Sequence, residues 1–130
     1  DQGASYAQRG CDLVSRLIAR NSSVVAWSGN LRRQCLLQRG AIELQRGQPA
    51  AAMATAEQVA GNVQAGNAAD PAARSDLARA RMIGGDALQM LGRSADARRQ
   101  WTVAVRQWPG AQAKAPDDLA LRASLLRRLG

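Results

Sequence analysis

The strongest constraint on the fold of this chain is an internal repeat with a step of 45 residues. The segment "GAIELQRGQPAAA", which starts at Gly40, aligns without a gap with "GDALQMLGRSADA", which starts at Gly85. In both segments a second glycine follows after seven residues and an alanine after five more. Repeats of this size are units that bury their apolar faces only by stacking on their neighbours. The sequence therefore predicts stacked units of similar structure.

The composition indicates that these units are helical. Hydrophobic residues make up 46% of the 130 positions, but there is no Phe and only three Trp and one Tyr, whereas Ala is abundant. Small side chains of this kind suit closely packed helices, and the β-branched and aromatic runs that are typical of strands are missing. The chain is predicted to be all-α, with six helices at about 4–20, 23–46, 49–65, 71–91, 94–108 and 116–129.

The clearest helix boundaries surround residues 70–110. Asp70 is expected to accept from the free amides of the following helix, and Pro71 fits its first position. Gly92 is a natural stop, and Ser94 is expected to cap the next helix, which Pro109 ends. Because the connection between the two helices is so short, they are predicted to form an antiparallel hairpin.

The same region resembles the tetratricopeptide repeat. That family's pattern of small, aromatic and turn residues is matched by Gly85, Gly92, Ala97, Trp101, Ala104 and Pro109. The resemblance implies about six antiparallel helices stacked as hairpins into a short α-solenoid, in one domain over residues 1–130. Its parts would be a half repeat at 4–20, a weak repeat at 23–66, a good repeat at 70–109 and a C-terminal capping helix at 116–129. An ordinary bundle of Ala-rich helices is the alternative.

Two expectations concern the ends of this array. The capping helix should cover the Trp101 hairpin with Leu119, Ala123 and Leu126, and leave Arg122 and Arg127 outside. The first helix lacks its partner, and the chain starts with Asp rather than Met, so we expect a C-terminal fragment of a longer protein. An apolar side of the first helix should then lack cover and could support self-association; it would be formed by Leu13, Val14, Leu17 and Ile18.

The inventory of side chains argues against an enzyme. There is no His, which excludes His-based catalytic triads and His metal ligands. Two Cys do not make a four-ligand zinc site, and no Gly-rich phosphate loop with a following Lys is present. We expect no catalytic residue, no metal and no cofactor.

The net charge of +8 allows two interpretations. It could form a surface for nucleic acid or an acidic partner, or it could be a solvated basic surface. All but one of the 18 Lys and Arg residues are arginine, and they are spread along the chain without a run longer than two. Nucleic-acid binding is therefore not expected. No stretch of 18 apolar residues exists, so no membrane insertion is expected either.

The resemblance implies instead a non-catalytic interaction scaffold, in which the first helix of each hairpin lines a concave groove for a peptide or helix of a partner protein. Carried over by position, the good repeat would contribute Arg79, Met82, Ile83, Asp86, Gln89 and Met90, and the weak repeat Gln34, Leu37, Gln38, Ala41, Leu44 and Gln45. Packing of Met82, Ile83 and Met90 against a neighbouring helix is the alternative for those residues. The alternative for the whole chain is a structural or sensor arm of a larger bacterial regulator or kinase, without its own ligand.

The two cysteines carry the remaining question, that of compartment. If helices 4–20 and 23–46 form a hairpin, Cys11 and Cys35 lie at similar heights and could be bonded. They could equally be two small buried thiols. A bond would indicate an oxidising compartment such as the bacterial periplasm, and its absence the cytoplasm.

Overall fold

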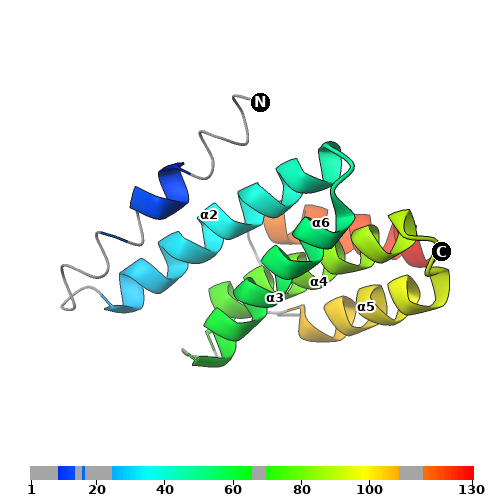
Figure 1. Cartoon of the computed structure of the whole chain (residues 1–130). Coiled ribbons are helices and arrows are strands. Elements are labelled where there is room, and N and C mark those ends of the chain that lie inside the picture. Colours follow the sequence, from blue (N-terminus) through cyan, green and yellow to red (C-terminus); the bar gives the residue numbers. More distant parts are fainter. Residues whose placement is uncertain (1–8, 14–15, 17–24, 66–69, 109–115) are drawn as a thin grey trace.

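The structure, a computed structural model, describes residues 9–13, 16, 25–65, 70–108 and 116–130, and over these residues it contains helices joined by short turns and no strand (Figure 1). Five helices follow a first helical segment at residues 9–13: α2 (Val25–Gln45), α3 (Pro49–Ala65), α4 (Pro71–Met90), α5 (Ser94–Gln107) and α6 (Pro116–Leu129). The all-α prediction with six helices is confirmed, and the later five boundaries lie within two residues of those expected. Of the expected helix 4–20, the described residues are helical and the rest lie outside the described part.

The helices stack in the order of the chain. α2 packs on α3 and α4 on α5, and within each pair the helices run in opposite directions (Figure 1). α3 and α2 both contact α4, and α6 contacts α5 and, more weakly, α4. α4 is therefore the central helix, which explains why its buried residues lie on several sides of it rather than on one face.

Two glycines make the tight turns inside the hairpins. Gly47 and Gly92 have φ angles of 68° and 79°, in the left-handed region that costs glycine nothing. After α4, the amide of Arg93 bonds back to the carbonyl of Leu88 at 2.9 Å, which satisfies one of the free carbonyls at the helix end. The two turns are 45 residues apart and have the same conformation, as the internal repeat predicts.

One of the two predicted helix caps is confirmed. The carboxylate of Asp70 accepts from the amide of Ala72 at 3.3 Å. The Ser94 prediction is wrong: the cap position is Arg93, and no side chain caps α5. The turn is one residue shorter than expected, because the amide of Ala97 already bonds to the carbonyl of Arg93 at 3.0 Å, which makes Ser94 the first helical residue.

Trp101 packs between the two helices of the second hairpin, α4 and α5. Its side chain is 7% exposed and packs in a cluster contributed by α4, α5 and α6: Ala78, Leu88, Ala97, Trp101, Ala104, Leu121 and Leu125. Gly85 lies directly against the indole, where a β-carbon would come within 2.4 Å of Nε1. Trp101 is therefore buried between its own hairpin and α6.

The predicted face of α6 is wrong. Leu119 and Leu126 are 53% and 46% exposed, and Ala123 is exposed as well. The covering residues are Leu121 and Leu125, the second of which is fully buried. The expectation that Arg122 and Arg127 lie outside is confirmed, since both are exposed.

An ion pair lies on the same side of α6 as the two buried leucines. Arg128 donates from Nε to Oδ1 of Asp86 at 2.7 Å and from Nη2 to Oδ2 at 2.9 Å. Such a two-pronged bond between guanidinium and carboxylate is strong and fixes orientation. Leu121 and Leu125 lie seven and three residues before Arg128 and share its side of the helix, so the bond and the two leucines together hold this side of α6 against the hairpin, and Leu119 and Leu126 lie outside.

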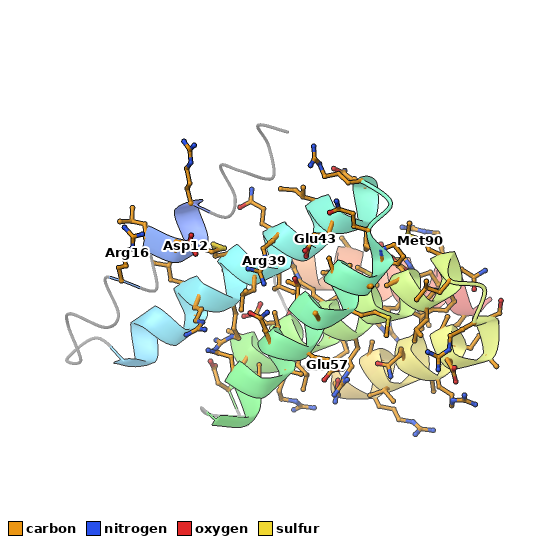
Figure 2. The ribbon with its side chains drawn as sticks, viewed as in Figure 1. Asp12, Arg16, Arg39, Glu43, Glu57 and Met90 are labelled. Carbon is orange, nitrogen blue, oxygen red and sulfur yellow. A yellow bond between two sulfur atoms is a disulfide. The ribbon has the colours of Figure 1, made fainter. Side chains whose placement is uncertain are left out.

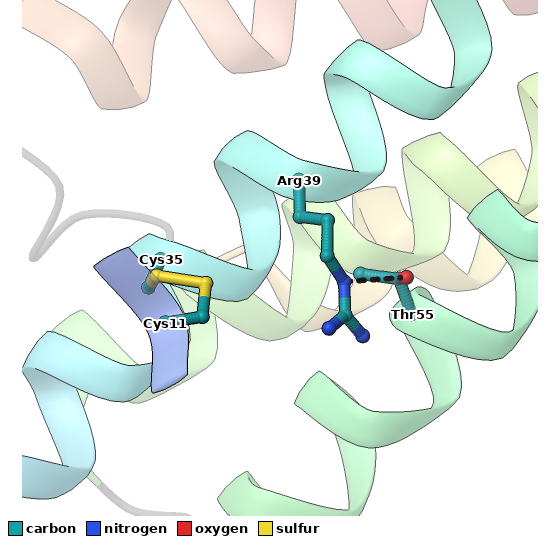
Figure 3. Close-up of a disulfide and its surroundings, with 4 residues drawn as sticks. All are labelled: Cys11, Cys35, Arg39 and Thr55. Carbon is teal, nitrogen blue, oxygen red and sulfur yellow. Dashed lines mark hydrogen bonds between the residues drawn. A yellow bond between two sulfur atoms is a disulfide. The ribbon is translucent and has the colours of Figure 1, made fainter. Parts of the chain in front are cut away.

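A disulfide between Cys11 and Cys35 holds the first helical segment on α2 (Figure 3). The two Cα atoms are 5.5 Å apart, within the range that a disulfide requires. The alternative of two free thiols is therefore excluded. Of the apolar residues expected to lack cover on this helix, Leu13 is 57% exposed, whereas Val14, Leu17 and Ile18 lie outside the described residues.

Candidate binding groove

A hollow that is open to solvent lies between α2 and α4. Its volume is about 450 Å³, and it is lined by Gln34, Leu37, Gln38, Ala41, Arg79, Met82 and Ile83. All seven belong to the positions expected to line a groove. Three pairs of them, 34 with 79, 37 with 82 and 38 with 83, are related by the 45-residue step of the repeat.

The groove has an apolar floor and a polar rim. Leu37 and Ile83 are each 7% exposed and belong to the core cluster that joins α2, α3 and α4, so they form the floor. Gln34 and Gln38 are exposed at the rim, and Met82 is partly buried between floor and rim. Ile83 was expected either to line the groove or to pack against a neighbouring helix, and it does both.

Asp86 does not line the groove, contrary to expectation. Besides its bond to Arg128, its Oδ1 accepts from Nε1 of Trp101 at 3.1 Å. The carboxylate is therefore committed to joining α4, α5 and α6. The remaining expected positions also lie outside the groove: Leu44 packs on the core, Gln45 and Gln89 are exposed, and Met90 is 49% exposed at the end of α4 (Figure 2).

A buried ion pair supports the groove from beneath. Nε of Arg33 donates to Oδ2 of Asp76 at 2.9 Å, and the two side chains are only 8% and 6% exposed. The amide nitrogen of Gln34 donates to the other oxygen of Asp76 at 2.9 Å, which fixes this rim residue. Nη1 of Arg33 also donates to the side-chain oxygen of Asn62 in α3 at 3.1 Å. The network joins α2, α3 and α4. Sequence reasoning missed it because its partners are 29 to 43 positions apart in the chain.

A second polar network lies on the side of α2 that faces α3. Arg39 and Glu43 are one turn apart on α2 (Figure 2), and both bond to the buried hydroxyl of Thr55. The hydroxyl donates to Glu43 at 2.5 Å and accepts from Nε of Arg39 at 3.3 Å (Figure 3). This network uses Glu43 within the hairpin, away from the groove.

Arg79 is the one charged residue that lines the groove, and no described residue neutralises its charge. Its Nε is buried and has no hydrogen-bond partner, and Arg79 forms no ion pair with a described residue. The two acids nearest to it along α4, Asp76 and Asp86, are bonded to Arg33 and Arg128. A buried polar group without a partner is rare in folded proteins and calls for an explanation.

The described residues contain neither a metal-binding cluster nor a helix that could span a membrane. None of them form a cluster of three His, Cys, Asp or Glu side chains that could hold a metal ion. Among the helices of the described part, none combines the length and the apolar character that crossing a membrane requires.

No protein-family model matches the chain, and no curated protein or solved structure matches it significantly. Function must therefore follow from the geometry and the charge of the groove.

Proposed function

We propose that this chain is a non-catalytic protein-interaction module whose groove between α2 and α4 binds a segment of a partner protein. The observation that carries the proposal is the groove itself, an open hollow of about 450 Å³ with an apolar floor and amide side chains at its rim. Sites that bind peptides combine apolar pockets with a few polar groups that fix orientation. The groove also lies where residues of two successive repeat units meet.

We further propose that the module belongs to the tetratricopeptide-like class of helical repeats. Its support is the equivalence of positions 45 residues apart. Ala52 and Ala97 are both fully buried, and Gly47 and Gly92 both have positive φ. The stacking of α3 and α2 on α4 is the arrangement of successive hairpins in such arrays.

Blocking the groove tests the proposed function. Ala41 lines the groove and is exposed, so Ala41→Trp should fill the hollow without disturbing the core. Ala54 is exposed on α3 outside the groove, and Ala54→Trp is the matched control. Short random peptides displayed on phage are selected on the full chain. The proposal expects that the selected peptides bind the control as they bind the unaltered chain and lose binding to Ala41→Trp. Equal binding to both variants would refute it.

The compartment that we propose is an oxidising one, such as the bacterial periplasm. The Cys11–Cys35 bond supports it, because structural disulfides are rare in the reducing cytosol. Protein from its natural source, alkylated without reductant and analysed by mass spectrometry, should carry no alkyl group on either cysteine. Two alkylated thiols would contradict the proposal.

A further inference from the structure

We infer that the groove selects an acidic segment, in which a carboxylate side chain pairs with Arg79 while an apolar side chain about one helical turn away rests on Met82 and Ile83. The inference rests on the proposed function and specifies the chemistry of the partner. It follows from the state of Arg79, from the charges around it and from the spacing of the groove residues.

The guanidinium of Arg79 has an N–H donor without a hydrogen-bond partner. Because its buried Nε lacks a partner, a hydrogen-bond donor is already removed from water and remains unused. An arginine side chain offers five N–H donors in a planar fork that matches a carboxylate. A ligand carboxylate in the groove would accept from the terminal N–H groups of this guanidinium and neutralise its charge.

The residues that line the groove around Arg79 carry no opposite charge. The other residues that line the groove are uncharged, so nothing there competes for its charge. Asp76 is bonded to Arg33 and Gln34, and Asp86 to Arg128, which leaves no nearby acid of α4 available. The groove is thus locally positive in a chain of net charge +8, and this charge attracts an anionic segment.

The spacing of the groove residues along α4 puts apolar side chains next to the charge of Arg79. Met82 and Ile83 follow Arg79 by three and four residues, so they lie next to it on the same face of α4. The apolar contact therefore lies about one helical pitch, roughly 5 Å, from the charge. A segment with Asp or Glu near a bulky apolar side chain meets both features at once. A phosphate backbone would find the charge but nothing apolar to rest on the floor.

The test compares two arginines of equal charge. Arg79→Gln removes the charge in the groove, and Arg106→Gln removes an exposed charge on α5, which does not line the groove. Short random peptides displayed on phage, selected on the full chain, should be enriched in Asp or Glu three or four residues from an apolar residue. A selected peptide should lose roughly 10- to 100-fold in affinity with Arg79→Gln, the range for a hydrogen bond to a charged group. With Arg106→Gln its affinity should stay unchanged.

A matched peptide completes the test. Replacing the acid of the peptide by Gln should weaken binding to the unaltered chain as much as Arg79→Gln does, and the two changes together should cost little more than either alone. Peptides that lose binding to Ala41→Trp but show no preference for acids would overturn this inference and leave the proposed function intact. An equal loss with Arg79→Gln and Arg106→Gln, or displacement of the peptide by a short DNA duplex, would also overturn it. Peptides that bind Ala41→Trp unchanged would refute the proposed function itself.

Discussion

The contact between Gly85 and Trp101 leads to the sharpest stability prediction. A β-carbon at position 85 would lie 2.4 Å from Nε1 and 2.5 Å from Cδ1 of the indole, closer than real β-carbons come to other atoms. The ring is 7% exposed and enclosed by three helices, so it has little room to withdraw. A shift of the ring would also break the bond from its Nε1 to Asp86. Gly85→Ala should therefore destabilise the fold.

Three contributions determine how much Gly85→Ala lowers the free energy of unfolding. Overpacking a filled core costs about 1 to 3 kcal/mol, and the lost hydrogen bond about 1 kcal/mol. Replacing a helical glycine by alanine returns about 1 kcal/mol. The free energy of unfolding should fall by about 1 to 3 kcal/mol, which lowers the midpoint of thermal unfolding by about 3 to 9 °C for a domain of this size.

Two other glycines in helices serve as controls. Gly84 has Ala56 as its nearest neighbour at 4.0 Å, and Gly61 has nothing within 4 Å. Gly84→Ala and Gly61→Ala should each stabilise the fold by about 0.5 to 1 kcal/mol. Urea unfolding followed by far-ultraviolet circular dichroism measures all three variants. If Gly85→Ala were as stable as Gly84→Ala, the close packing inferred at Trp101 would be refuted.

Three further predictions use the same measurement. Trp101→Ala should cost about 3 to 5 kcal/mol through the cavity that it leaves, and a loss below about 1 kcal/mol would contradict the packing of the second hairpin. Asp76→Asn should cost about 3 to 5 kcal/mol, because it leaves Arg33 buried without its counter-charge; a neutral effect would show that the pair is not buried. Replacing Cys11 and Cys35 by Ala should cost about 3.5 kcal/mol, since the bond closes a loop with a sequence separation of 24, and an unchanged midpoint would show that the bond does not restrain the unfolded chain.

The limits of the helices could be predicted from the sequence because the signals are local. Asp70 and Pro71 begin α4 with a side-chain cap and a preset φ angle, and Gly92 ends its last turn with a positive φ. Each signal acts within a few residues, so the rest of the fold does not have to be known. The Ser94 prediction failed because the Gly92 turn ends one residue earlier than expected, which makes Ser94 the first helical residue and puts Arg93, whose side chain has no acceptor, at the cap position.

The rotation of α6 could not be predicted from its own sequence. Leucines recur at helical spacing on two sides of this helix, and either side could have covered the hairpin. The side that is buried packs on the Trp101 cluster and bonds through Arg128 to Asp86, two residues that are 42 positions apart. Pairings at that distance leave no periodic trace in a single sequence.

The sequence predicted where the candidate groove lies but not which charges in it are neutralised. The resemblance to the tetratricopeptide repeat placed Gln34, Leu37, Arg79 and Met82 on one surface. It could not tell which charges are neutralised. Asp86 was expected to line the groove as well, yet it is bonded to Arg128 of α6.

The packing of α2 on α4 and the charge of the groove both depend on Asp76. Asp76 precedes Arg79 by three residues on α4, a spacing at which an acid and an arginine of one helix can pair. Arg33 and Gln34 of α2 bond to the two oxygens of Asp76 instead, so the contact that joins α2 to α4 also leaves Arg79 without an ion pair to a described residue. The acid that joins the two helices is thus the reason that the groove keeps a positive charge for a ligand.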